Sequence, residues 1–183
     1  GRSYAQMTAE DLVLVDVKTG EYQGSLKPSS ERGLHLEIYR SRPEVHAVIH
    51  THQMNASTVA AARREVPPIL DDMAQIIGPS VRVAAYALPS TKKIVRTTVK
   101  ALRGRMAALM GNHGAVTVAA DYAHAIQNAE FFELACGVIV RNGGTQGIVD
   151  KVARWARTPR SGQLATWAMG LIIFFDDYTN TLM

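Results

Sequence analysis

Two histidines, His50 and His52, stand one residue apart at the end of the apolar run Val45 to His52 (VHAVIHTH). Such a run predicts a β-strand. Because strand side chains alternate between two faces, both imidazoles would point to the same side, with Cα atoms about 6.6 Å apart, and could bind one metal ion. His46 would share that face. At about 13 Å from His50 it is too distant for nitrogen–metal bonds near 2 Å, so we exclude it.

A third ligand is needed, because a His-x-His pair alone is as typical of two structural histidines as of a metal site. His113 is the candidate, since it lies in a glycine-flanked turn, Gly111-Asn112-His113-Gly114, where the backbone can aim an imidazole. Taken alone, a turn histidine more often makes a backbone hydrogen bond. A catalytic zinc, however, typically has three protein ligands and one position open to substrate. The three histidines together therefore predict a metal site.

The segment Ser29-Ser30-Glu31 follows Pro28 at a predicted helix start. Two hydroxyl groups and the free backbone N–H groups of a helix N-terminus can bind a phosphate group. Helix capping explains the same residues without any ligand and is the commoner use of such a motif. The functional interpretation gains weight only in combination with the histidines.

The elements that must position these residues are strands and helices without a regular parallel alternation. We expect strands over residues 12–17, 45–52, 81–87, 106–110 and 115–120, and helices over 28–42, 56–64, from Ser90 onward, and from Asp121 to Gly143-Gly144. No glycine-rich dinucleotide fingerprint follows any of the strands. This order predicts one α/β domain in which layers of helices enclose a largely antiparallel sheet.

Composition narrows the classes of function. The net charge of +4 comes from 20 basic and 16 acidic residues that are scattered along the chain, so we expect no nucleic-acid partner. The longest apolar run, Trp167 to Phe175, is about half of the roughly 20 residues that a membrane span needs, so we expect no membrane partner. Cys136 is the only cysteine, which excludes an intrachain disulfide and suits a reducing, cytoplasmic setting.

Four motifs occur in one order along the chain: PSSE, a strand ending in HTH, the stretch IIGPSVRVAAYALPST, and GNHG. In this the chain resembles the class II aldolase/adducin family, most of all its fuculose-phosphate aldolases. The resemblance implies an α/β/α domain over residues 1–146, without the family's N-terminal segment, and leaves residues 147–183 as an unassigned tail. It also implies a homotetramer.

The resemblance further assigns roles to site residues. It implies that His50, His52 and His113 hold Zn²⁺ or another divalent metal, that Ser29 and Ser30 bind the substrate phosphate, and that Glu31 is the catalytic acid/base. The implied substrate is a small phosphorylated sugar. The implied reaction is reversible cleavage of a ketose 1-phosphate, such as fuculose 1-phosphate, into dihydroxyacetone phosphate and an aldehyde.

Two alternatives remain open at this point. Related epimerases look to carry Asp where this chain has Glu31, which favours an aldolase, but dehydratases of the family act on related substrates. A non-catalytic interaction module, as in adducin, is opposed by the three retained histidines. The tyrosine proton donor of the fuculose-phosphate enzymes has no counterpart near Asp71-Asp72, and Tyr178 is the remaining candidate for the family's C-terminal tyrosine.

Overall fold

The structure is a computed structural model that describes residues 4–24 and 26–155. The chain divides into two compact units, Gly1–Gly137 and Val138–Met183. The first unit contains every residue predicted for the active site apart from Tyr178. In the second unit, residues 138–155 belong to α5 (Tyr122–Trp155), the long helix that begins in the first unit.

A four-stranded sheet in the order β3-β6-β5-β4 forms the centre of the first unit. The strands are β3 (Ala47–Thr51), β4 (Val83–Ala84), β5 (Ala107–Met110) and β6 (Gly114–Ala119). β6 pairs antiparallel with β3 and with β5, whereas β4 pairs parallel with β5. Both β5 and β6 are buried along their whole length, as expected for apolar strands covered on two faces. The predicted α/β fold with a largely antiparallel sheet is confirmed.

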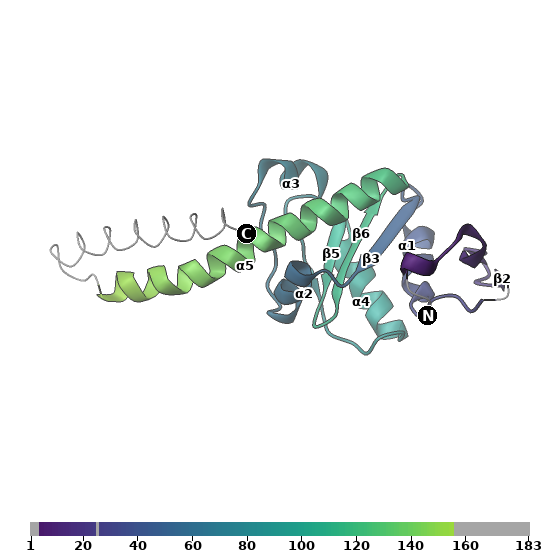
Figure 1. Ribbon diagram of the computed structural model, residues 1–183, viewed down its shortest axis with the longest axis horizontal. Coiled ribbons are helices and arrows are strands. Elements are labelled where there is room, and N and C mark those ends of the chain that lie inside the picture. The colour runs from purple at the N-terminus through teal and green to yellow at the C-terminus, as the bar shows by residue number, and fades with distance from the viewer. Residues whose placement is uncertain (1–3, 25, 156–183) are drawn as a thin grey trace. The chain divides into compact units, whose positions relative to one another are not determined.

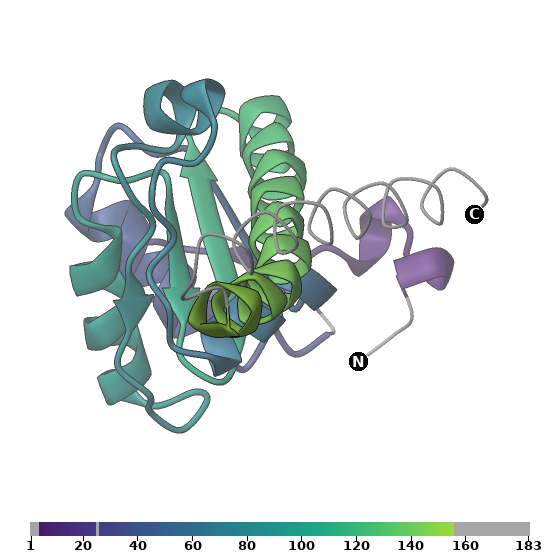
Figure 2. The same cartoon turned by 90° about the vertical axis from the view of Figure 1, so that its left-hand side faces the viewer.

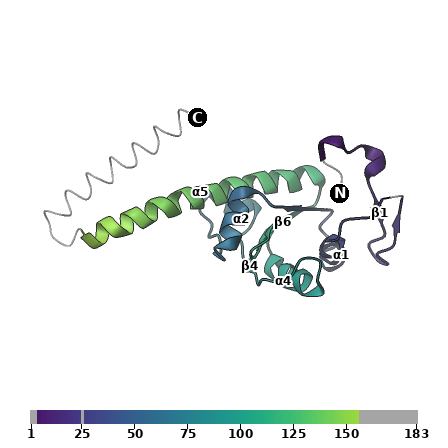
Figure 3. The ribbon, with the colours of Figure 1, turned by 60° about the horizontal axis from the view of Figure 1, so that its bottom comes forward.

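Helices cover both faces of this sheet, as Figures 2 and 3 show. On one face lie α1 (Arg32–Ser41) and α4 (Lys92–Leu102), and on the other lie α2 (Met54–Ala61) and the N-terminal part of α5. The side chains that join α1 and α4 to the sheet form one apolar cluster, which includes Leu34, Ile38, Ile94, Leu102, Val116 and Val118. On the opposite face, Ala125 at the start of α5 packs against Ala47 and Ala119.

The start and end of α5 differ in how well the sequence predicts them. Asp121 accepts a hydrogen bond from the backbone N–H of His124 at 2.9 Å, so the predicted N-cap is confirmed. The predicted end at Gly143-Gly144 is wrong, because the helix continues to Trp155 (Figure 1). Glycine in a helix costs about 1 kcal/mol relative to alanine but keeps its backbone N–H donor, so a glycine pair does not compel a helix to end.

The N-terminal region forms two 3₁₀ turns (Tyr4–Gln6 and Ala9–Asp11) and a small hairpin of β1 (Leu14–Val15) and β2 (Tyr22–Gln23). The predicted strand over residues 12–17 is therefore shorter than expected. β1 has one neighbour only, and its Leu14 is 73% exposed, so little burial supports a longer strand. A further helix, α3 (Asp71–Ile76), was not predicted.

None of the helices in the described part of the chain is long and apolar enough to cross a membrane.

Candidate metal centre

Sheet geometry determines where His50 and His52 point. His50 lies in β3, opposite Val116 of β6, and His52 follows immediately after the strand. Val48 packs on the cluster beneath α1, so His50, two residues later, points to the same face of the sheet. The side chain of His50 thus points to the face of the sheet that α1 covers.

His113 reaches this position through the turn between β5 and β6. Its backbone N–H donates to the carbonyl of Met110 at 2.9 Å, and Asn112 adopts a left-handed backbone with φ +57°. Gly114 lies against β3 so closely that a Cβ there would collide with the carbonyl oxygen of Thr51 and come within 2.7 Å of Cδ2 of His52. The glycine after His113 therefore permits the two histidine-bearing segments to touch.

The three imidazoles converge through their Nε2 atoms. Nε2 of His50 lies 3.2 Å from Nε2 of His52 and 3.3 Å from Nε2 of His113. The ring centroids of the three histidines are 4.8–5.1 Å apart. A tetrahedral zinc site with bonds of 2.0–2.1 Å has ligand–ligand edges of about 3.3 Å, so these spacings fit a metal ion.

A backbone hydrogen bond orients His50 within the cluster. Its Nδ1 atom lies 2.8 Å from the carbonyl oxygen of Ala115, which can only accept, so Nδ1 carries the hydrogen. The Nε2 lone pair of a neutral His50 is then free for a metal. Metal-binding histidines typically donate their second N–H to such an oxygen, which fixes the tautomer and the ring.

Glu31 brings a carboxylate into the same cluster. Its Oε2 atom lies 2.9 Å from Nε2 of His50 and 3.4 Å from Nε2 of His113. Potential ligand atoms of Glu31 and the three histidines all lie within 4.8 Å of one another. The spacing of Glu31 along the chain gives no sign of this proximity, which depends on how the beginning of α1 packs against the end of β3.

Ser29 and Ser30 are exposed and precede α1, which begins at Arg32. The hydroxyl oxygen of Ser29 accepts a hydrogen bond from the backbone N–H of Glu31 at 3.2 Å, a local turn contact just before the helix. Ser29, Ser30, Arg32 and His35 line one face of a cavity of about 1060 Å³. These residues therefore surround an open space next to Glu31.

His35 lies on α1 and is partly buried. Burial lowers its pKa, the charge of a protonated His50 lowers it further, and the carboxylate of Glu31 acts in the opposite direction. Its surroundings beside the cavity thus favour the neutral imidazole.

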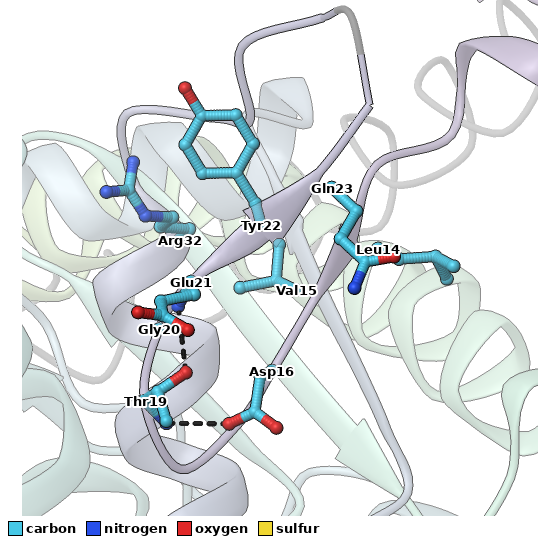
Figure 4. A pocket seen from close by; sticks show the side chains of 9 residues that line it. All are labelled: Leu14, Val15, Asp16, Thr19, Gly20, Glu21, Tyr22, Gln23 and Arg32. Atoms are coloured by element: carbon cyan, nitrogen blue, oxygen red, sulfur yellow. Dashed lines mark hydrogen bonds between the residues drawn. The ribbon is translucent and has the colours of Figure 1, made fainter.

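A second cavity of about 760 Å³ lies between the β1–β2 hairpin and Arg32 (Figure 4). Two hydrogen bonds fix the turn of this hairpin. Asp16 accepts one from the backbone N–H of Thr19 at 2.6 Å, and the Thr19 hydroxyl accepts the other from the backbone N–H of Glu21. Neither the histidines nor Glu31 line it.

Asp71 and Asp72, the acidic residues nearest the position of the family's tyrosine proton donor, do not belong to the cluster of Glu31 and the three histidines. Asp71 and Asp72 are exposed in the first turn of α3, where carboxylates interact favourably with the helix dipole. Tyr178 lies outside the described residues, as does the apolar stretch from Trp167 to Phe175. His46 is exposed just before β3 and apart from the cluster.

Comparison with known proteins decides the family. A model of the class II aldolase and adducin N-terminal domain matches residues 1–140. The chain belongs to the class II aldolase and adducin family. It is 32% identical over 138 residues to 5-deoxy-D-ribulose 1-phosphate aldolase of Bacillus thuringiensis serovar kurstaki, a match covering 75% of this chain and 64% of that protein.

Other class II aldolases give similar matches. The 5-methylthioribulose-1-phosphate/5-deoxyribulose-1-phosphate aldolase of Rhodospirillum rubrum is 35% identical over 74% of this chain and 61% of its own length. A solved structure of L-fuculose 1-phosphate aldolase superposes with a TM-score of 0.75 at 31% identity, covering 79% of this chain and 68% of that chain. The chain thus spans somewhat less than two thirds of the length of these two curated relatives.

Proposed function

We propose that this chain is a divalent-metal-dependent aldolase that reversibly cleaves a ketose 1-phosphate to dihydroxyacetone phosphate and an aldehyde. The observation that carries the proposal is the convergence of three Nε2 atoms and one carboxylate within 4.8 Å. An interaction module of the same fold has no need to gather these groups, so the cluster favours catalysis over the adducin-like alternative.

The donor set suits zinc. Zinc is commonly bound by imidazole and carboxylate, and catalytic sites combine three protein ligands with a position open to substrate. His50, His52 and His113 would hold the ion, with Glu31 in reach of the same position. A divalent ion bound there supplies a Lewis acid that stabilises negative charge on substrate oxygens.

Glu31 is proposed as the acid/base. A substrate held at the three histidines comes within reach of its carboxylate, because Oε2 is 2.9 Å from Nε2 of His50. The carboxylate can hold the proton that one cleavage step releases and return it to carbon in another. The side chain is only 15% exposed, so bulk water has little access to compete for that proton.

The phosphate is proposed to bind at the start of α1. Ser29 and Ser30 offer hydroxyl donors, and Arg32 adds positive charge beside the cavity that they share. The Arg32 guanidinium lies over the Tyr22 ring of the β1–β2 hairpin, with Cζ 5.8 Å from the ring centroid, which restrains its orientation. The metal and phosphate positions are then neighbours, joined by Glu31.

An epimerase or dehydratase on a related sugar phosphate is the second candidate. It would use the same metal and phosphate positions, so the cluster does not separate it from an aldolase. Glu31 and the names of the relatives favour the aldolase, since these proteins are described as aldolases of 5-deoxyribulose 1-phosphate and of L-fuculose 1-phosphate.

The test is metal content together with dihydroxyacetone phosphate release from fuculose 1-phosphate, ribulose 1-phosphate and 5-deoxyribulose 1-phosphate. The proposal expects one divalent metal per chain, zinc in particular, and release that a chelator stops. Metal without release from any of the three would favour the epimerase or dehydratase. Absence of bound metal would overturn the proposal. A homotetramer, to be measured by light scattering, and a cytoplasmic location stay predictions.

A further inference from the structure

Glu133 on α5 makes three hydrogen bonds to the N-terminus of α2. Its Oε1 accepts from the backbone N–H and from the side-chain Nδ2 of Asn55, at 2.8 and 2.9 Å. Its Oε2 accepts from the backbone N–H of Ala56 at 2.9 Å. A carboxylate thus engages the two N–H groups of the first turn that an N-cap side chain would normally satisfy.

α2 has no cap of its own. The residue in the N-cap position, Gln53, makes no side-chain capping bond. The negative charge of Glu133 also lies at the positive end of the helix dipole, which strengthens such hydrogen bonds. The beginning of α2 is therefore fixed by a side chain that is remote in sequence, on the helix that covers the same face of the sheet.

α2 connects both segments that carry the histidines. It begins at Met54, two residues after His52. Near its other end, the carbonyl of Ala60 accepts the backbone N–H of Asn112, the residue before His113, at 3.2 Å. A shift of α2 would therefore move the end of β3 and the β5–β6 turn together.

We infer that Glu133 is a positioning residue that aligns His52 and His113 by holding α2. It touches neither the histidines nor the substrate position and acts only through the helix. The expected effect on metal affinity rests on the proposed function. The expected effect on the positions of His52 and His113 applies to the metal-free chain as well. Outer residues that orient metal ligands typically contribute 10–100-fold to metal affinity.

The experiment compares wild type with Glu133→Ala, Glu133→Gln and the matched control Glu130→Gln, which changes an exposed glutamate one turn earlier on α5. The first readout is binding of Co²⁺, measured by competition with a chelator and by the visible absorption spectrum of the bound ion. Glu133→Ala should weaken binding 10–100-fold and change the spectrum. Glu133→Gln should lie between, because an amide oxygen can still accept from one N–H.

The second readout is the set of imidazole NMR signals of the metal-free chain. They should move in both Glu133 variants and not in Glu130→Gln. If wild type bound no Co²⁺, the proposed function would fail, while these signals would still test the positioning. Should Glu133→Ala not fold, Glu133→Gln carries the test. If the Glu133 variants had the same Co²⁺ affinity, absorption spectrum and imidazole signals as Glu130→Gln, the inference would be overturned.

Discussion

The two halves of the candidate site are built differently. The histidine half is carried by the central sheet. Strand register positions His50, the β5–β6 turn positions His113, and the hydrogen bond from Nδ1 of His50 to the carbonyl of Ala115 orients the His50 ring. The other half, where the phosphate is proposed to bind, lies at the start of α1 beside the exposed β1–β2 hairpin. Its residues Ser29 and Ser30 are exposed. The proposed metal position thus lies on the core and the proposed phosphate position at the periphery, so we expect large effects of substitutions at the first and smaller ones at the second.

The largest effect should come from His50→Ala. Removing the histidine that contacts both of the others and Glu31 should abolish metal binding and lower activity at least about 1000-fold, because the Lewis acid is lost. Metal analysis and dihydroxyacetone phosphate release measure this. His46→Ala, an exposed histidine just before the same strand, is the control and should behave as wild type. Full activity of metal-free His50→Ala would refute a metal mechanism.

Glu31→Gln should separate metal binding from proton transfer. The three imidazoles remain, so metal should stay bound, but the amide cannot act as a base, and kcat should fall by about 10²–10⁴. Metal content and kcat, measured on one preparation, check this. A variant with bound metal and wild-type kcat would assign the acid/base role to another group.

Gly114→Ala should test the close approach of the two histidine segments. A methyl group there collides with the backbone of Thr51, so β3 and the turn must separate. We expect a loss of about 1–3 kcal/mol in the free energy of unfolding, together with weaker metal binding. Gly104→Ala is a useful contrast, because Gly104 has φ +65° but open space around its Cβ position. Stability loss in Gly114→Ala no larger than in Gly104→Ala would show that the approach is not tight.

In the proposed phosphate half, Ser30→Ala should raise KM about 10–150-fold and leave metal content unchanged, since a hydrogen bond from a hydroxyl to a charged group is worth about 1.5–3 kcal/mol. Steady-state kinetics with a ketose 1-phosphate measure it. An equal fall in kcat with unchanged KM would instead indicate a role in the reaction itself.

The smallest effect should be the pH dependence contributed by His35. Its pKa is lowered in the folded chain, so the unfolded chain takes up the proton more readily, and stability falls as pH decreases below about 6.5. His35→Asn should reduce this loss between pH 7.5 and pH 5.5 in urea unfolding of the metal-free chain. An identical loss in wild type and variant would contradict the assigned burial effect.

Much of the fold follows from local pattern. The alternation and length of the apolar runs predict β3, β5 and β6, and the capping residue predicts the start of α5. The strand period also explains why His50 and His52 meet. The pairing of β3 with β6 brings His113 beside them, however, and this long-range register has no local signal. Glu31 and His35 approach the site, and Glu133 reaches α2, through helix packing, which the sequence pattern does not encode.

The central claim is that the Nε2 atoms of His50, His52 and His113 hold one divalent metal. A crystal structure of the purified chain, with anomalous scattering recorded on both sides of the zinc absorption edge, tests it most directly. We expect one peak about 2.0–2.1 Å from all three Nε2 atoms. A fully metal-loaded chain whose only peak lies elsewhere, or touches fewer than two of these histidines, would contradict it.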